Sequence, residues 1–250
     1  MLRSDPRTPG LDGAAAALPL RICLLSGGAS RRMGRDKALL PHPAGGTWLE
    51  HGLRLLAELR APITLLSRHD SHLQLARYLN RTWAAGRIVR PAGTSIAASG
   101  TAAPALGSPS TDPQAGALPG PIQAIAEPPP WQGPLLALHR LMELHRDQCL
   151  LLCPVDMPVL TLAAVHDLLA AAAAAPALIH VAHDGQRSQP LLGLYPSTAA
   201  SRDQLAAVLA AGERRLQTWL SAQAHRNVVL DARALRNVNR PQEYPREWRG

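Results

Sequence analysis

The residues best suited to chemistry stand in the stretch LLSGGASRRMGRDKALLP, residues 24–41. An apolar run, residues 20–25, leads into Gly27 and Gly28, which lack Cβ atoms, so backbone N–H groups could approach an anion closely. The cations that follow are Arg31, Arg32, Arg35 and Lys37. They would balance the charge of a polyphosphate. The stretch has neither the Walker spacing nor the G-x-G-x-x-G fingerprint, so it predicts a third kind of phosphate-binding loop.

A second candidate for chemistry is Asp156, which follows the apolar run LLLCPV at residues 150–155. An acid at this place is either a helix N-cap or a metal ligand at the end of a strand. In an anionic nucleotide site a carboxylate repels the substrate unless a cation lies between them. Mg²⁺ held by one or two carboxylates and by substrate phosphates is the usual solution. We therefore expect Asp156 to bind Mg²⁺, and Asp36 to orient Lys37 or a backbone N–H of the loop.

The loop resembles the [AG]-G-x-S-x-R-M-G-x-D-K signature of nucleotidyltransferases in the molybdenum cofactor guanylyltransferase family. Further matches follow in the family's order: GPLLAL at 133–138, CPVDMP at 153–158 and NVNRPQE at 237–243. Together they span residues 20–245, interrupted by one insertion. The resemblance implies a Rossmann-like α/β fold of the nucleotide-diphospho-sugar transferase type. In that fold a mostly parallel sheet carries helices on both faces and a small hairpin subregion.

The resemblance also implies roles for individual residues. The implied nucleotide-binding residues are Leu25, Ser26, Gly27, Gly28, Lys37, Glu127 and Asp156. The implied catalytic residues are Lys37, Arg31, Arg32 and Asp156, with Asp156 holding Mg²⁺ as the cofactor. Asn237 and Asn239 would bind the acceptor, although they also fit an Asn-rich turn before a helix at Pro241, and Glu127 also fits a solvated loop. Ser67 stands where the family has an Asn at the end of its second strand, and could replace it as a hydroxyl donor.

The reaction that the resemblance implies is the transfer of GMP from GTP to the terminal phosphate of molybdopterin, with release of pyrophosphate. Both reactants are anions, so positioning and charge neutralisation should supply most of the catalysis. The alternative in the same family is a cytidylyltransferase that uses CTP. The S-G-G of residues 26–28 is closer to the A-G-G of the guanine enzymes than to the A-A-G of the cytosine enzymes. A non-catalytic molybdopterin carrier is an alternative of another class, but a carrier would need neither Lys37 nor Asp156.

The composition of the chain argues for and against other classes of protein. The formal net charge of +8 fits an anionic partner, but it also fits a GC-rich genome that favours Arg and Ala. The arginines are spread along the chain without a dense basic block, which argues against nucleic-acid binding. No apolar run approaches the length of a membrane span, which argues against a membrane protein. Three cysteines, an odd count, are typical of reduced thiols, so we expect a cytoplasmic protein. Its expected partners are GTP, molybdopterin and, transiently, cofactor biosynthesis proteins or recipient apoenzymes.

The elements that must position these residues follow from hydrophobic periodicity. We expect a disordered tail at 1–18 and one domain at 19–250, with a low-complexity insertion at about 91–121. The predicted strands are 20–25, 62–67, 87–89, 148–158, a hairpin at 177–195 around Asp184-Gly185, and 227–231. The predicted helices are 47–60, 69–83, 133–145, 161–175, 198–211, 213–222 and a short one from Pro241. This alternation predicts parallel strands whose carboxyl ends carry the loop and Asp156, which is where such sheets bind ligands.

Overall fold

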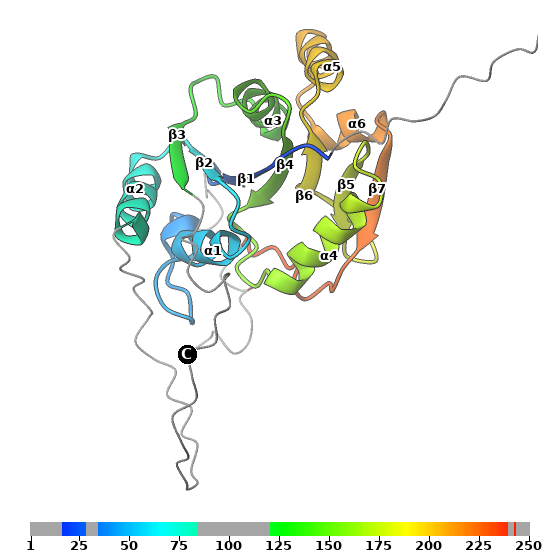
Figure 1. Ribbon diagram of the computed structural model, residues 1–250. Coiled ribbons are helices and arrows are strands. Elements are labelled where there is room, and N and C mark those ends of the chain that lie inside the picture. Colours follow the sequence, from blue (N-terminus) through cyan, green and yellow to red (C-terminus); the bar gives the residue numbers. More distant parts are fainter. Residues whose placement is uncertain (1–16, 29–34, 85–120, 240–242, 244–250) are drawn as a thin grey trace, which may run out of the picture.

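The computed structural model describes residues 17–28, 35–84, 121–239 and 243. Within these residues the chain forms one seven-stranded sheet with the order β3-β2-β1-β4-β6-β5-β7 (Figure 1). The strands are β1 (Leu20–Leu25), β2 (Ile63–Ser67), β3 (Ile122–Ala126), β4 (Cys149–Pro154), β5 (Ile179–His183), β6 (Ser188–Pro196) and β7 (His225–Val229). The α/β fold with a mostly parallel sheet is therefore confirmed.

Strand direction divides the sheet into two parts. The strands β3, β2, β1 and β4 are parallel to one another. The strand β6 runs antiparallel to both of its neighbours, β4 and β5, while β7 is parallel to β5. The predicted hairpin is thus the β5–β6 pair, and its turn contains Gly185 with φ +91° and the Asp184 carboxylate accepting from the Gln186 and Arg187 N–H groups.

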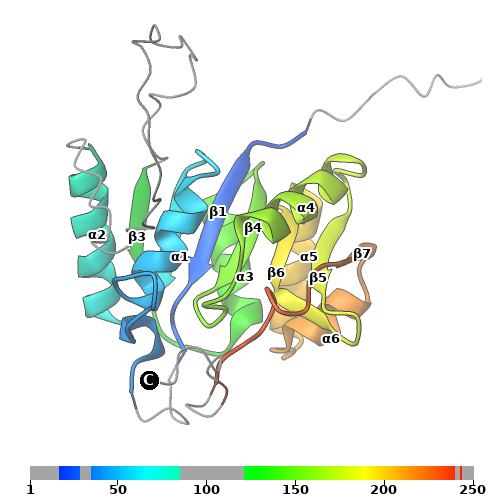
Figure 2. The ribbon, with the colours of Figure 1, turned by 90° about the horizontal axis from the view of Figure 1, so that it is seen from below.

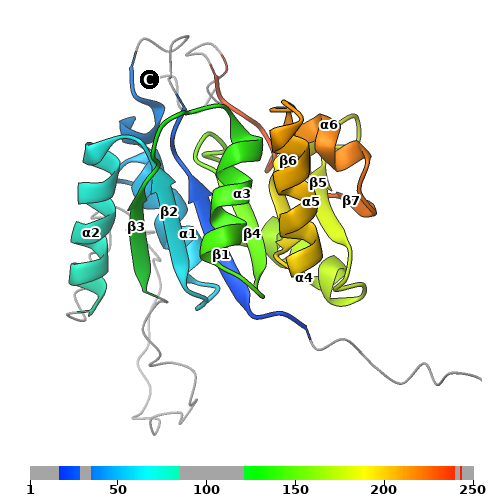
Figure 3. The ribbon, with the colours of Figure 1, turned by 90° about the horizontal axis from the view of Figure 1, so that it is seen from above.

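The helices cover both faces of the sheet (Figures 2 and 3). They are α1 (Trp48–Ala57), α2 (Asp70–Ala84), α3 (Pro134–Leu144), α4 (Leu162–Ala173), α5 (Ala199–Ala210) and α6 (Leu216–Ser221), with a 3-10 turn η1 (Lys37–Leu39). One apolar cluster joins α1, α2 and α4 to one face of the sheet, and a second joins α3, α5 and α6 to the other. None of the helices in the described part of the chain is long and apolar enough to cross a membrane.

Local sequence explains why these helices begin where they do. Thr47 and Glu50 form a reciprocal capping box at the start of α1, and Leu49, Leu53 and Leu56 then repeat at helical spacing and are buried. At the start of α4, the hydroxyl of the N-cap residue Thr161 accepts from the Ala164 N–H. The described helices agree with the predicted ranges to within a few residues at each end.

One strand of the sheet was not predicted. The sheet's edge strand β3 is Ile122–Ala126, which pairs in parallel with β2, whereas the sequence indicated no strand between 121 and 133. The run IQAIA is short and only partly buried, so it lacks the continuous apolar pattern of a central strand. The predicted strand at 87–89, residues 91–120 of the predicted insertion, most of the predicted tail and the helix start at Pro241 lie outside the described residues.

Candidate active site at the carboxyl ends of the strands

A cavity of about 560 Å³ opens at the carboxyl ends of the parallel strands. That size is in the range of small-molecule sites, and the position is the one where parallel α/β sheets bind ligands. The turn after β1 supplies one wall through Leu25, Ser26, Gly27 and Gly28. Other predicted site residues on its lining are Lys37, Glu127, Asp156 and Asn239. Residues from distant parts of the sequence therefore meet at one site.

The Lys37 ammonium donates hydrogen bonds to two side-chain oxygen atoms. Its Nζ lies 2.6 Å from Asn239 Oδ1 and 3.4 Å from Asp156 Oδ2. Asp156 follows β4, and its backbone carbonyl accepts from the Val238 N–H at 3.0 Å, which brings the segment of Asn239 alongside. The Asp36 carboxylate caps η1 by accepting a hydrogen bond from the Ala38 N–H at 3.1 Å. This agrees with the prediction that Asp36 orients Lys37 or a backbone N–H of the loop. The ammonium is therefore fixed in the cavity next to a carboxylate and an amide.

The composition of the chain sets Lys37 apart, although the motif analysis did not use this observation. The chain has 26 Lys and Arg residues, and Lys37 is the only lysine among them. The other 25 are arginines. A lysine is a compact point charge, whereas arginine is a planar fork. The single ammonium thus stands at the position where the cavity brings a carboxylate and an amide together.

Glu127 lies directly after β3 and reaches back to the glycine turn. Its Oε1 accepts from Arg140 Nη1 at 3.2 Å, and a Cβ added to Gly27 would lie 2.9 Å from its Oε2. Only glycine therefore allows this close approach. Burial raises the pKa of the Glu127 carboxyl, and the Arg140 and Arg68 guanidinium groups partly offset the effect. Glu127 lines the cavity, so it is not a solvated loop residue.

An exposed tryptophan lies at the mouth of the cavity. Trp131 is 52% exposed, and its Nε1 donates to the Glu127 carbonyl at 2.9 Å. The Arg68 guanidinium carbon lies 5.4 Å from the centre of the Trp131 ring, a cation–π distance. Neither residue belongs to a motif that the sequence revealed. The available signal was an aromatic residue directly after three prolines, in a chain that has no Phe and only 3% aromatic residues.

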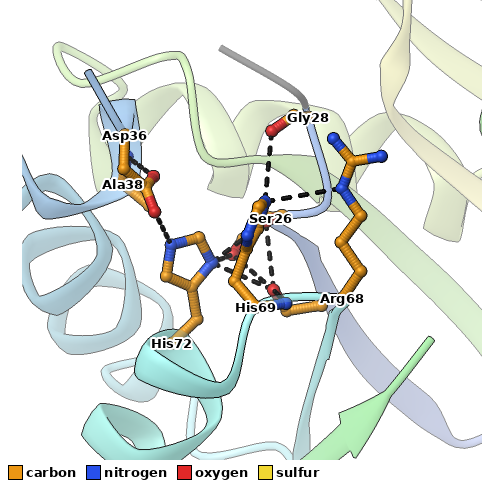
Figure 4. Close-up of polar contacts among 8 residues, drawn as sticks. Ser26, Gly28, Asp36, Ala38, Arg68, His69 and His72 are labelled. Atoms are coloured by element: carbon orange, nitrogen blue, oxygen red, sulfur yellow. Dashed lines mark hydrogen bonds and ion pairs between the residues drawn. The ribbon is translucent and has the colours of Figure 1, made fainter.

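Behind the glycine turn lies a buried polar cluster that the sequence did not reveal (Figure 4). His72, in the first turn of α2, contacts Ser26, Ser67 and Asp36. Ser67 is fully buried and donates to the Ser26 carbonyl at 3.1 Å. It does not line the cavity, so the expectation that it offers its hydroxyl to the substrate is wrong.

The two asparagines near residue 240 face different ways. Asn239 meets Lys37, whereas Asn237 donates to Gln189 Oε1 at 3.1 Å, and Gln189 donates to Asp184 Oδ2 at 2.9 Å. Backbone N–H groups of Arg187 and Gln186 lower the pKa of Asp184 to about 2. Asn237 therefore belongs to the β5–β6 hairpin rather than to the cavity lining. Arg31 and Arg32 lie outside the described residues, and their predicted role stays a prediction.

The residues around Lys37 fit a hard divalent cation. The described residues contain no group of three or more His, Cys, Asp or Glu side chains able to hold a metal by themselves. Mg²⁺ does not need such a cage, because it binds one or two carboxylates and completes its shell with water and substrate phosphates. The Asp156 carboxylate, 27% exposed on its side chain, and the Asn239 amide oxygen supply donors of the required type.

Comparison with known proteins gives relatives that match almost end to end. A family model described as a MobA-like NTP transferase domain matches residues 22–228. A probable molybdenum cofactor guanylyltransferase from Rhodopirellula baltica is 33% identical over 233 residues, which are 91% of this chain and 90% of that protein. A protein of the same description from Mycobacterium tuberculosis is 30% identical over 231 residues, covering 90% of this chain and 92% of that protein.

Solved structures agree on the fold. The molybdopterin-guanine dinucleotide biosynthesis protein A of Archaeoglobus fulgidus superposes with a TM-score of 0.57 at 14% identity, covering 89% of this chain and 94% of that one. The 4-diphosphocytidyl-2C-methyl-D-erythritol synthase of Anaerococcus prevotii gives 0.57 at 8% identity, covering 90% and 94%. Since the family model spans most of the chain and carries the loop and Asp156 with it, the chain belongs to the MobA-like NTP transferases and is a nucleotidyltransferase.

Proposed function

We propose that this nucleotidyltransferase transfers GMP from GTP to the terminal phosphate of molybdopterin and releases pyrophosphate. The observation that carries the proposal is the cavity in which the only lysine of the chain lies beside Asp156 and opposite the glycine turn. The names of the Rhodopirellula and Mycobacterium relatives support the choice of substrates. Recipient apoenzymes and biosynthesis proteins as transient partners, and a cytoplasmic location, stay predictions.

The reaction is a substitution at phosphorus. An oxygen of the acceptor's phosphate monoester forms a bond to the α-phosphorus of the nucleotide, and the bond from that phosphorus to the bridging oxygen of pyrophosphate breaks. The nucleophile is already an anion, so no general base is required. Lys37 is placed to neutralise charge on the triphosphate, and the N–H groups of the glycine turn are placed to bind its oxygens.

Asp156 and Asn239 would hold Mg²⁺. When bound, the ion would neutralise phosphate charge and stabilise pyrophosphate as a leaving group. The side chains and backbone of the protein bind and align the two substrates. The glycine turn binds the triphosphate on one side of the cavity, and Lys37, beside the segment containing Asn239, binds it on the other side. Holding two anions in line at close range is the main contribution such a site can make.

Glu127 supports guanine rather than cytosine as the base. The edge of guanine that pairs with cytosine offers two adjacent donors, N1–H and the N2 amino group, which match the two oxygens of one carboxylate. The corresponding edge of cytosine has one donor, the N4 amino group, beside two acceptors, N3 and O2, so a carboxylate that accepts from N4 has its second oxygen opposed to the acceptor N3. The buried carboxylate of Glu127 beside Gly27, with Arg68 and Arg140 close enough to affect its pKa, suits guanine.

The test is pyrophosphate release by the purified protein with Mg²⁺ and molybdopterin, with GTP and CTP offered separately. Release with GTP alone is expected, and release with CTP alone would assign the protein to the cytidylyltransferases. Asp156→Asn should abolish release, while Asp167→Asn, which changes an exposed acid on α4, should not. Silence with both nucleotides from a folded protein that binds molybdopterin, unaffected by Asp156→Asn, would favour a carrier.

A further inference from the structure

Ser26, Ser67 and His72 are buried behind the glycine turn and meet Asp36, whose side chain is 31% exposed. We call these four residues the His72 cluster, and Figure 4 labels Ser26, His72 and Asp36. Its members come from four places: the end of β1, the end of β2, the first turn of α2 and the residue before η1. His72 is 1% exposed, Ser26 2% and Ser67 0%. Burying so many polar groups is tolerated only where each has a hydrogen-bond partner.

Hydrogen bonds link all four residues of the His72 cluster. The imidazole Nε2–H donates to Asp36 Oδ2 at 2.7 Å, since a carboxylate only accepts. The Nδ1 atom lies within hydrogen-bond distance of the Ser26 hydroxyl, of the Ser67 hydroxyl and, at 3.0 Å, of the Ser26 carbonyl. The Ser67 hydroxyl donates to the Ser26 carbonyl at 3.1 Å and accepts from the His69 N–H at 3.1 Å. Every polar side-chain atom of the cluster therefore has a hydrogen-bond partner.

The His72 cluster connects two walls of the cavity. Both oxygens of Asp36 are bonded, Oδ2 to His72 and Oδ1 to the Ala38 N–H, which fixes the residues on either side of Lys37. Both the hydroxyl and the carbonyl of Ser26 are bonded as well, which fixes the backbone leading into Gly27. One imidazole thus sets the distance between the ammonium and the turn that faces it.

We propose that His72 is a positioning residue that holds Lys37 and the glycine turn in the geometry needed for nucleotidyl transfer. The inference rests on the proposed function, because it concerns the same site. It adds a residue that touches neither cavity nor substrate: His72 is not among the residues lining the cavity. Displacements of about 1 Å in a site that works by alignment can lower a rate by about 100-fold, so such support has a measurable effect.

The same residue types also make up hydrolase triads, but the geometry excludes that role here. A triad histidine must pass a proton from the serine to a leaving group in the cavity. His72 is enclosed, with Nε2 directed to Asp36 and Nδ1 to the two serines. The imidazole itself does not line the cavity, so it does not reach a substrate directly, and its bonds link segments of the chain.

The first test uses variants that remove one link at a time. His72→Ala removes both, and its kcat with GTP should fall about 10- to 100-fold. His72→Gln retains an amide donor near the position of Nε2, so it should restore a large part of kcat. Asp36→Asn keeps an oxygen that accepts from the Ala38 N–H, but it replaces the oxygen that faces His72 Nε2–H by an NH2 donor. Two donors then face each other, so this variant should lower kcat as well. The double variant His72→Ala/Asp36→Asn should be no worse than the poorer single one, because both break the same link.

The matched control is His145→Ala. His145 is also buried, at 4% exposed, and has a side-chain hydrogen bond to Thr64 Oγ1 at 2.8 Å near the start of β2. Its loss should lower thermal stability as the loss of His72 does, yet leave kcat and KM for GTP unchanged. If His72→Ala and His145→Ala behave alike, with a lower melting temperature and wild-type kinetics, the inference is overturned. If His72→Ala does not fold, the kcat values of His72→Gln and Asp36→Asn test the inference instead. Wild-type kcat in both of these variants would overturn the inference.

A second readout needs no turnover. Because the chain has a single lysine, an amine-reactive reagent followed by peptide mapping reports on Lys37 alone, apart from the α-amine. His72→Ala should raise the rate of Lys37 modification severalfold without nucleotide, and His145→Ala should not. An unchanged rate would contradict the inference. Failure of the proposed function is distinguishable, because in that case the wild-type protein itself releases no pyrophosphate from GTP.

Discussion

At the scale of single residues, the choice between two cations matters most. The Lys37 side chain is 14% exposed and lies between a carboxylate and an amide oxygen. An ammonium donates in three directions from a single point, whereas a guanidinium spreads the same charge over a plane. In a chain that otherwise uses arginine in place of lysine, the ammonium is the feature that this position requires.

Lys37→Arg should therefore fail although it preserves the charge. A planar guanidinium cannot place its charge at the single point from which the ammonium reaches both Asp156 and Asn239, so we expect kcat to fall about 100-fold, the loss typical of a misplaced charge-stabilising donor. Steady-state pyrophosphate release with GTP measures it. Arg226→Lys, the reverse exchange at an exposed site on β7, is the control and should leave kcat unchanged. Wild-type kcat in Lys37→Arg would show that positive charge alone suffices.

Glu127 predicts a pH dependence whose sign follows from its raised pKa. A raised pKa means that the carboxylate takes up its proton at a higher pH than an ordinary glutamate. Protonation turns one of its two acceptors into a donor, so affinity for GTP should fall as the pH is lowered from neutral towards the pKa of the carboxyl. Titration calorimetry at several pH values measures this. Glu127→Gln should bind GTP more weakly at neutral pH and lose the pH dependence; an unchanged slope would remove Glu127 from the base site.

At the scale of elements, the ends of β1 and β3 depend on one another. Gly27 follows β1 and Glu127 follows β3, and the two strands are separated in the sheet by β2. The Glu127 N–H donates to the Ser67 carbonyl at 2.8 Å, and this bond extends the β2–β3 ladder into the cavity wall. The position of the carboxylate is thus set by strand pairing, while its approach to the turn requires the missing Cβ of Gly27.

Gly27→Ala should alter the nucleotide specificity of the protein but leave its thermal stability nearly unchanged. The new Cβ would meet only the flexible end of Glu127, 2.9 Å away, so the carboxylate can move aside and the melting temperature should change little. Its displacement should raise KM for GTP about tenfold, equivalent to about 1.4 kcal/mol, and lower the preference for GTP over CTP. Gly52→Ala in α1, where a Cβ makes only ordinary contact with Leu24, is the control. An unaltered GTP preference would contradict the role given to Glu127.

Local sequence predicted most elements because their signals are local. Strand β1, the capped helices α1 and α4, and the hairpin at Asp184-Gly185 each depend on patterns within a few residues. Strand β3 did not follow from its sequence, because it is stabilised by pairing with β2 and by contact with α2 rather than by its own apolar content. Ile122 N–H, for example, donates to Asn80 Oδ1 at 2.9 Å on α2.

The candidate site was predictable only in part, for a similar reason. Motif positions such as Lys37 and Asp156 lie at the cavity, while Asn237 is bonded to Gln189 on β6 instead. His72 was hidden in a helical pattern whose neighbours Leu73 and Ala76 are core residues. A buried histidine gains its role from what three other segments bring to it, and no spacing in one segment encodes that.

At the scale of the whole molecule, the low-complexity stretch in the middle of the chain invites a deletion. The elements on either side, α2 and β3, contact each other directly through Asn80 and Ile122, so their placement does not depend on the length of the connection. Joining the chain across residues 93–119 should therefore leave kcat and KM for GTP within about twofold, since loop-closure entropy varies slowly with length. A large fall in kcat from a well-folded deletion variant would show that these residues take part in the reaction.

The contact between Lys37 and Asn239 joins residues 202 positions apart in the sequence. It makes the site one of the last features of the molecule that synthesis can complete, because the amide arrives after every strand of the described sheet has been made. A nascent chain can thus assemble its sheet while still unable to turn over nucleotide. A protease cut just before Val238 would keep every strand together with the buried Ala234 and Leu235 but detach Asn239, so proteolysis at this point should remove the activity without unfolding the sheet.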